Sequence, residues 1–134
     1  MNPPQDLLEV ARAAQNRAYS PYSNYRVGAA IRLQSGEVFG GCNVENASYG
    51  ATICAERGAI CAATAALGQI EIVEILVISD GDPPWPPCGM CRQVIAEFAT
   101  QNCGLWCVNQ HGTAVFQPFE AIFPRAFDGT FLTK

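Results

Sequence analysis

The sequence is poor in charge and has no long hydrophobic runs. Only 15% of its 134 residues are charged, with 8 Lys and Arg against 12 Asp and Glu. Binding to a polynucleotide backbone usually needs a basic face, so this balance argues against a nucleic acid partner. No apolar run approaches the roughly 20 residues that span a bilayer, and the N-terminus lacks the basic and apolar regions of a signal peptide. We therefore expect a cytoplasmic protein without a membrane partner.

Histidine is also scarce, while cysteine is not. The single histidine, His111, lies in a polar turn where we expect it to be solvated, which argues against a Ser-His-Asp site. The seven cysteines are odd in number, so they cannot all pair as disulfides, and in a reducing compartment they act as metal ligands or buried thiols. A hydrophobic fraction of 49% predicts a packed core, and we expect one domain over residues 1–134. The low charge also predicts that part of the surface is buried against other subunits.

Apolar spacing and turn residues predict an alternation of helices and strands. We expect helices over about 4–18, 54–67, 88–100 and 119–123, and strands over 27–33, 38–43, 72–79, 105–109 and 114–116. This order predicts an α/β fold, a three-layer α/β/α sandwich with a mixed sheet of about five strands.

Two segments carry the residues for metal chemistry, Cys54-Ala55-Glu56 and Pro87-Cys88-Gly89-Met90-Cys91. Each begins a predicted helix, and helix N-termini stabilise thiolates. Three thiolates on one Zn²⁺ per subunit leave its fourth position open to water, as in catalytic rather than structural zinc sites. Zinc lowers the pKa of that water, and Glu56, two residues from a ligand, is placed to move its protons.

Arg57 and Arg92 follow the cysteines closely, and we hypothesise that they donate to the thiolates. Three other interpretations compete. Cys88 and Cys91 also fit a redox dithiol, another cysteine is available to close a four-ligand structural site, and Glu56 on its own reads as an exposed first-turn glutamate. Among the remaining cysteines, we expect Cys42 and Cys61 to be buried small apolar residues.

The motifs resemble those of the small, homotetrameric cytidine deaminases. The resemblance rests on Asn43-Val44-Glu45-Asn46-Ala47-Ser48-Tyr49, Cys54-Ala55-Glu56-Arg57 and Pro87-Cys88-Gly89-Met90-Cys91-Arg92-Gln93-Val94-Ile95, and it extends to 22–30 and 123–127. It implies a cytidine deaminase-like fold with Cys54, Cys88 and Cys91 as zinc ligands and Glu56 as proton shuttle. It also implies a nucleoside substrate, with Asn43 and Glu45 on the ribose and Tyr49 and Phe127 reaching a site that can belong to a neighbouring subunit. The implied substrate-binding residues are Tyr25, Asn43, Glu45, Tyr49, Ala55 and Phe127.

The resemblance implies hydrolytic deamination of cytidine and 2′-deoxycytidine in pyrimidine salvage, by a homotetramer with active sites near subunit interfaces. Three positions depart from the family pattern. Tyr25 stands where the family commonly has Phe, Gly58 stands where it often has Thr, and the bulky Trp85 lies beside the ligand loop. We expect these departures to affect the preference among cytosine derivatives. The alternatives are a related deaminase of blasticidin S or a modified cytosine nucleoside, a polynucleotide-editing enzyme, and a non-catalytic zinc-stabilised binding module.

Overall fold

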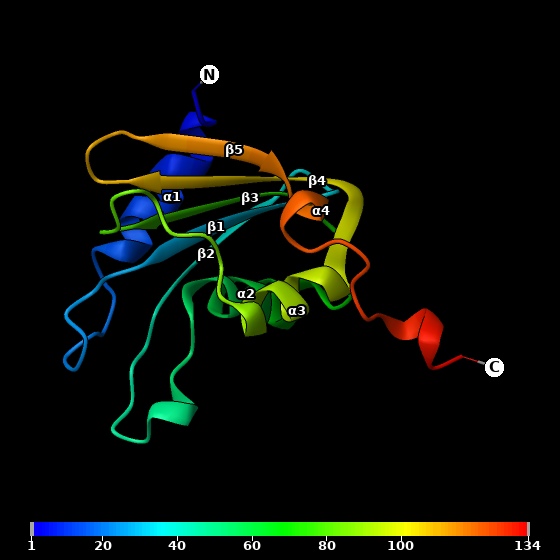
Figure 1. The fold of residues 1–134 in the computed structure, drawn as a ribbon, viewed down its shortest axis with the longest axis horizontal. Coiled ribbons are helices and arrows are strands. Elements are labelled where there is room, and N and C mark those ends of the chain that lie inside the picture. Colours follow the sequence, from blue (N-terminus) through cyan, green and yellow to red (C-terminus); the bar gives the residue numbers. More distant parts are fainter. Residues whose placement is uncertain (1, 134) are drawn as a thin grey trace.

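The computed structural model describes residues 2–133, and a five-stranded mixed sheet lies at its centre (Figure 1). The strand order is β2-β1-β3-β4-β5. The neighbours β3 and β4 run parallel, and the other three neighbouring pairs run antiparallel. The strands are β1 (Gly28–Leu33), β2 (Val38–Cys42), β3 (Ile72–Ser79), β4 (Ala99–Asn109) and β5 (Ala114–Pro118). The predicted mixed sheet of about five strands is confirmed.

Helices cover both faces of this sheet, as the three-layer prediction requires. Helix α1 (Gln5–Gln15) packs on one face, and α2 (Ala55–Leu67) and α3 (Gly89–Phe98) pack on the other (Figure 1). The short elements are η1 (Tyr49–Ala51), α4 (Phe119–Ile122) and η2 (Gly129–Phe131). Within residues 2–133, no helix has the length and apolarity that a membrane crossing needs.

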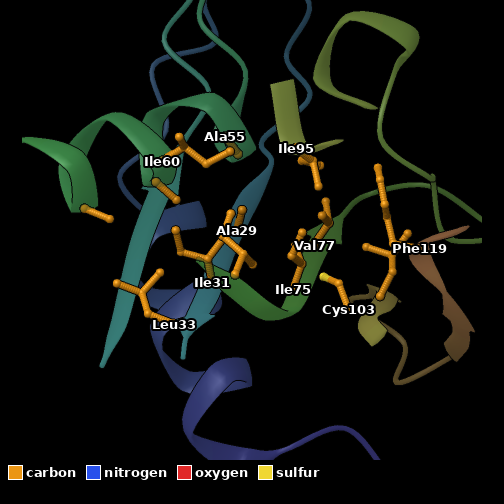
Figure 2. Packing of buried hydrophobic residues seen from close by; sticks show 14 of the residues in the cluster. Ala29, Ile31, Leu33, Ala55, Ile60, Ile75, Val77, Ile95, Cys103 and Phe119 are labelled. Carbon is orange, nitrogen blue, oxygen red and sulfur yellow. The ribbon is translucent and has the colours of Figure 1, made fainter. Parts of the chain in front are cut away.

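Strand β3 is apolar on both sides because both faces of the sheet are covered. Its Ile75 and Val77 pack toward α2 and α3, while Leu76 and Ile78 face α1. Figure 2 shows the larger cluster, in which Val77 lies close to Ile95 of α3. The α2 and α3 helices are therefore held on the sheet by a continuous apolar layer, and this layer also fixes the position of their N-terminal ends.

Three predicted boundaries are wrong. The first helix ends at Gln15 instead of residue 18, because the next amides turn back to Ala14 and Gln15 in a tighter turn. Helix α3 ends at Phe98, and β4 begins at Ala99 instead of residue 105. The early part of β4 is partly exposed and pairs irregularly with β3, so it lacks the apolar run by which the rest of the strand was predicted.

One glycine sets how closely α2 approaches the sheet. A Cβ on Gly41 of β2 would lie 2.4 Å from the carbonyl oxygen of Ala55 and 2.4 Å from the amide nitrogen of Ala59. Such distances are shorter than any normal contact, so only glycine lets the backbones of β2 and α2 meet here. The start of α2, which carries Cys54 and Glu56, is seated by this contact.

Candidate active site

Three cysteine side chains meet where α2 and α3 begin. The Sγ atoms of Cys54, Cys88 and Cys91 lie within 4.8 Å of one another. Cys54 is the residue that caps the start of α2, Cys88 caps the start of α3, and Cys91 is buried in the first turn of α3. Both helix starts direct their partial positive charge toward this point, which favours thiolates. The structure thus brings together the three cysteines that the sequence pattern singled out.

An arginine compensates the charge of this cluster. Arg57 donates from Nη2 to Cys54 Sγ at 3.3 Å and to the Thr52 carbonyl at 3.1 Å. A hydrogen bond from Cys91, with a further one from Arg57, lowers the pKa of Cys54 to about 5 against the opposing effect of burial. The pKa of Cys91 is raised because it holds the proton in that shared bond. The Nε atom of Arg57 is buried and has no hydrogen-bond partner within residues 2–133, so the guanidinium keeps donor capacity at this site.

The cluster fits zinc. Its three donors are soft cysteine sulfurs, which as thiolates suit Zn²⁺. Among residues 2–133, no further ligand atom of Cys, His, Asp or Glu joins the group, which leaves the three-ligand arrangement of catalytic sites. Cys103 and Cys107 are instead buried within β4, and the expectation that Cys61 is buried is wrong, because it lies on the exposed side of α2.

Glu56 is buried beside the cluster. Only 4% of this residue is exposed, although it lies in the first turn of α2. Burial, with a smaller effect from the negative charge of Cys54, raises the pKa of Glu56 to about 7. The interpretation of Glu56 as an exposed first-turn residue is therefore wrong. A carboxyl group whose pKa lies near neutrality can both accept and release a proton at physiological pH.

Arg92 makes different contacts from those of Arg57. Its Nε donates to the Pro87 carbonyl at 2.9 Å, and its Nη1 donates to the Ile122 carbonyl at 3.0 Å. Within residues 2–133, none of its hydrogen bonds goes to a thiolate. Arg92 thus ties the residue before Cys88 to the end of α4, which fixes the ligand loop without touching the sulfurs.

A cavity of about 280 Å³ opens next to the cysteines and Glu56. Its walls come from the segment before β1, the start of α2 and the segment that links β3 to α3. It is lined by Ser23, Tyr25, Val27, Asn43, Thr52, Cys54, Ala55, Glu56, Val77, Ser79, Trp85, Pro86 and Cys88. Four of these, Tyr25, Asn43, Ala55 and Glu56, were predicted as substrate-binding or catalytic residues. Val77 and Ser79 were not predicted as lining residues, because no motif marks them and they reach the cavity only through the position of the β3 end in the sheet.

A second cavity of about 330 Å³ adjoins the first and shares Ser23 and Thr52 with it. Glu45 lines it and accepts hydrogen bonds from the backbone amides of Tyr22 and Ser23, at 2.9 and 3.0 Å, and from the Ser23 hydroxyl. These bonds, that from the Ser23 hydroxyl first, lower the pKa of Glu45. The rings of Tyr22 and Tyr49 meet edge to face at 6.0 Å on the same wall.

Asn43 joins the segments that form the first cavity. Its Nδ2 donates to the Tyr25 carbonyl and its Oδ1 accepts from the Val27 amide, both at 2.9 Å. Asn43 therefore holds the backbone on both sides of Arg26 in place. Phe127 lies outside both cavities, in the C-terminal segment that projects away from the sheet (Figure 1), where its ring stacks on Phe131 at 5.6 Å.

Comparisons with known proteins agree with this geometry. Residues 1–106 match the family described as the cytidine and deoxycytidylate deaminase zinc-binding region. The chain is 42% identical to a cytidine deaminase of Halalkalibacterium halodurans over 123 residues, 92% of each chain. It is also 42% identical to the cytidine deaminase of Burkholderia pseudomallei, whose crystal structure superimposes with a TM-score of 0.85 and covers 91% of this chain and 97% of that one. A blasticidin-S deaminase of Bacillus cereus is 29% identical over 133 residues, 91% of this chain and 90% of its own.

A mixed five-stranded sheet that carries a three-cysteine zinc site at two helix starts defines a zinc-dependent hydrolytic deaminase. Within that class, the chain belongs to the cytidine and deoxycytidylate deaminase family.

Proposed function

We propose that the protein hydrolyses cytidine and 2′-deoxycytidine to uridine and 2′-deoxyuridine, with release of ammonia. The observation that carries this proposal is the cavity of about 280 Å³ in which two of the clustered cysteines lie beside the buried carboxyl group of Glu56. A concave site that combines metal ligands with a carboxyl group of raised pKa favours metal-assisted hydrolysis. The identity to proteins named cytidine deaminase supports the choice of substrate.

Glu56 carries the proton transfers. When bound by Cys54, Cys88 and Cys91, Zn²⁺ supplies a Lewis acid that lowers the pKa of water and makes hydroxide available at neutral pH. Glu56 takes a proton from the attacking water and delivers it to ring N3. The Glu56 carboxylate then takes the proton of the hydroxyl group that has added to C4 and passes it to the amino group, so that the C4–N bond breaks, the C4 carbonyl of the uracil product forms and ammonia leaves. One carboxyl group serves both transfers because it is reprotonated within each cycle.

The other predicted residues bind the nucleoside at its two ends. Ala55 is the first residue of α2, so its amide has no partner within the helix and is available to the base. The ring of Tyr25 offers an aromatic face for stacking on the pyrimidine. Asn43 and Glu45 bind the ribose hydroxyl groups, and the ionised Glu45 makes the stronger, charge-assisted hydrogen bond.

The cavity linings favour an uncharged nucleoside over its phosphate. Neither the 280 Å³ cavity nor the 330 Å³ cavity has a lysine or an arginine among its lining residues. A 5′-phosphate bound there would lack the cationic partner that phosphate sites normally supply. Glu45, whose pKa is lowered, adds negative charge at the sugar end. We therefore infer that cytidine is preferred over cytidine monophosphate.

We also infer a homotetramer of one-domain subunits (residues 1–134) with one Zn²⁺ each, in which neighbouring subunits complete the active sites. In support, several apolar side chains outside the core are strongly exposed, among them Tyr49 at 75%, Phe127 at 55% and Leu132 at 72%. Exposed apolar residues of this size often mark an interface between subunits. Because three thiolate ligands need a reducing compartment, we place the enzyme in the cytoplasm, where it would return cytosine nucleosides to uridine in pyrimidine salvage.

A substrate panel with metal analysis tests the proposal. The purified protein is assayed with cytidine, 2′-deoxycytidine, cytosine, cytidine monophosphate and blasticidin S, and zinc is measured in the same preparation. We expect ammonia release with the two nucleosides and much slower turnover of the others. If blasticidin S is the best substrate, the alternative related deaminase replaces the proposal. If a fully zinc-loaded sample deaminates none of the compounds, hydrolytic deamination of nucleosides is refuted.

A further inference from the structure

An aromatic corner closes one side of the cavity. Trp85 lies on the segment that links β3 to α3, shortly before the ligand Cys88, and lines the cavity together with Tyr25. The two rings meet edge to face, with centroids 5.0 Å apart and an interplanar angle of 73°. Neither ring belongs to the core, since Trp85 is 39% and Tyr25 51% exposed. Both are therefore available to a molecule that enters the cavity.

The indole of Trp85 is held in place on its far side. A Cβ on Gly81 would lie 2.3 Å from Nε1 and 2.4 Å from Cδ1 of this ring, so the indole rests directly on the glycine backbone. The Ser79 hydroxyl lies within hydrogen-bond distance of the amides of Gly81, at 3.3 Å, and Trp85, at 3.5 Å. Ser79 itself is buried at the end of β3. Trp85 is thus fixed to the sheet through its backbone and its side chain.

The backbone of Tyr25 is fixed as well. Its amide donates to the Ser23 hydroxyl at 3.1 Å, and its carbonyl accepts from Asn43 at 2.9 Å. Because the Trp85 indole rests on Gly81 and the backbone of Tyr25 is fixed, we expect the Trp85 side of the corner to keep its shape when the cavity is filled. A rigid aromatic wall discriminates by size, because it cannot move aside for an additional group.

The proposed reaction determines which edge of the pyrimidine meets this wall. C4 must face the cysteine cluster, and N1, opposite C4 in the ring, carries the sugar toward Asn43. Glu56 and Ala55, at the start of α2, take the edge that holds N3 and the C2 carbonyl. The remaining edge, with C5 and C6, is then left for the segment after β3, which contributes Trp85 and Pro86 to the cavity lining. Helix α2 packs mainly over β1 and β2, whereas the segment that carries Trp85 leaves the sheet from the next strand, β3.

We propose that Trp85 is a specificity-determining residue that restricts the substituent at C5 of the pyrimidine ring, so that unsubstituted cytosine nucleosides are preferred over those with a 5-methyl or larger 5-substituent. The inference rests on the proposed deamination of cytidine and extends it to a class of substrates. The wall acts on the base alone and leaves proton transfer by Glu56 untouched.

The test compares cytidine with 5-methylcytidine in four proteins, the wild type, Trp85→Ala, Trp85→Phe and Phe116→Ala. Phe116 is a matched control, because it is 40% exposed like Trp85, packs on Trp106 and lies outside the cavity. We expect kcat/KM of the wild type to favour cytidine by about 10-fold or more, the usual range for one methyl group against a fixed wall. Trp85→Ala should reduce that ratio by about 10-fold, because kcat/KM for 5-methylcytidine rises. Trp85→Phe should retain most of the ratio, and Phe116→Ala should leave the ratio unchanged.

A Trp85→Ala variant that slows both substrates by the same factor would overturn the inference and reduce Trp85 to a structural support of the loop.

A second measurement separates this failure from failure of the proposed function. Equilibrium dialysis with uridine and 5-methyluridine reads the same preference without turnover, and we expect tighter binding of uridine by the wild type and a loss of that preference in Trp85→Ala. If the wild type binds these nucleosides with that preference but deaminates neither cytosine compound, the proposed function fails and the role of Trp85 stands. Equal affinities in the wild type refute the inference about Trp85 alone.

Discussion

The two glutamates of the cavity region lie in opposite environments. Glu56 is buried beside Cys54, Cys88 and Cys91, which form the metal end of the cavity region, and there burial and the negative charge of Cys54 raise its pKa to about 7. Glu45 lines the second cavity, the sugar end of our proposal, where the Ser23 hydroxyl and two backbone amides lower its pKa. When two carboxyl groups have environments that shift their pKa values in opposite directions, the groups are suited to different tasks. The first is suited to moving protons and the second to binding hydroxyl groups as a permanent anion.

The same contrast holds for the surroundings of the two glutamates. The metal end is formed by helix starts that are packed on the sheet, and Cys91, Ala55 and Glu56 are all buried. The sugar end is formed by loops, and its Tyr22 and Tyr49 remain 49% and 75% exposed. On our proposal, catalysis therefore depends on residues that one subunit supplies by itself. Recognition depends on a surface that, on our proposal, a neighbouring subunit covers.

The largest expected effect separates the two glutamates directly. Glu56→Gln keeps the size of the side chain but cannot carry protons, so kcat should fall by about 10²–10⁴-fold while the zinc content stays that of the wild type. Glu45→Gln should retain most of kcat and raise KM, because it weakens a bond to the sugar. Steady-state kinetics and metal analysis on both variants check the comparison. Near-normal turnover of zinc-loaded Glu56→Gln would refute the catalytic assignment.

The close contact between β2 and the start of α2, which positions the metal end, is tested at Gly41. A methyl group at this position collides with the backbone of α2 at 2.4 Å, so Gly41→Ala should lower the free energy of unfolding by about 3 kcal/mol, at the upper end of the overpacking range, and reduce zinc binding as the start of α2 shifts. Denaturant unfolding and the zinc content of the folded protein measure these effects.

Gly58 provides the matched control, since it lies on the facing helix. A Cβ there meets nothing closer than the Cys42 carbonyl at 3.5 Å, which is an ordinary contact. Gly58→Ala should therefore raise the free energy of unfolding by up to about 1 kcal/mol through better helix propensity, and zinc binding should stay unchanged. Equal destabilisation by both substitutions would contradict the close contact between β2 and α2.

The metal end was also the part that sequence analysis predicted best, and the physical reason is local. Cysteines at helix starts are constrained by the helices themselves, so the spacing of Cys88 and Cys91 already predicts that both face one point. The closing of the cavity was not predictable in this way. It depends on where the end of β3 lies relative to α2, which is a property of the whole sheet, and Val77 and Ser79 have no motif to mark them. The position of Cys61 on the exposed side of α2 was missed for a related reason, because small residues such as alanine and cysteine give a helix no clear apolar stripe.

The sugar end is tested by mixing subunits. Tyr49→Ala alone should lower kcat/KM by about 10-fold, or about 1.4 kcal/mol, if its ring contributes to a neighbouring site, because tyrosine is enriched among the interface residues whose truncation costs more than 1 kcal/mol. Co-assembly of Tyr49→Ala subunits with inactive Glu56→Gln subunits should then give more activity than the two separate samples together, since some sites in the mixture receive an intact Tyr49 from a neighbour. The same mixing with Glu56→Gln subunits tests whether Phe127→Ala subunits also gain activity from an intact Phe127 of a neighbour. Additive activities in the mixture, with full exchange of subunits, would mean that each site is completed within its own chain.

The smallest expected effect concerns the pH dependence of the sugar end. The Ser23 hydroxyl is the largest cause of the lowered pKa of Glu45, so Ser23→Ala should bring that pKa back toward its ordinary value. A carboxylate with a lowered pKa in the folded state contributes stability at pH values above its unfolded pKa, and this contribution is lost as the pH falls through the folded pKa. The wild type should therefore exceed Ser23→Ala in Tm near neutral pH, and the difference should narrow in acid. Because Glu45 lies on an exposed loop, we expect a difference of only a few degrees or less.

Ser35→Ala removes a hydroxyl that donates to Glu37 on the exposed β1–β2 turn and serves as control. A Tm difference between wild type and Ser23→Ala that stays constant from neutral to acid pH would show that Ser23 acts on the loop without acting on the charge of Glu45.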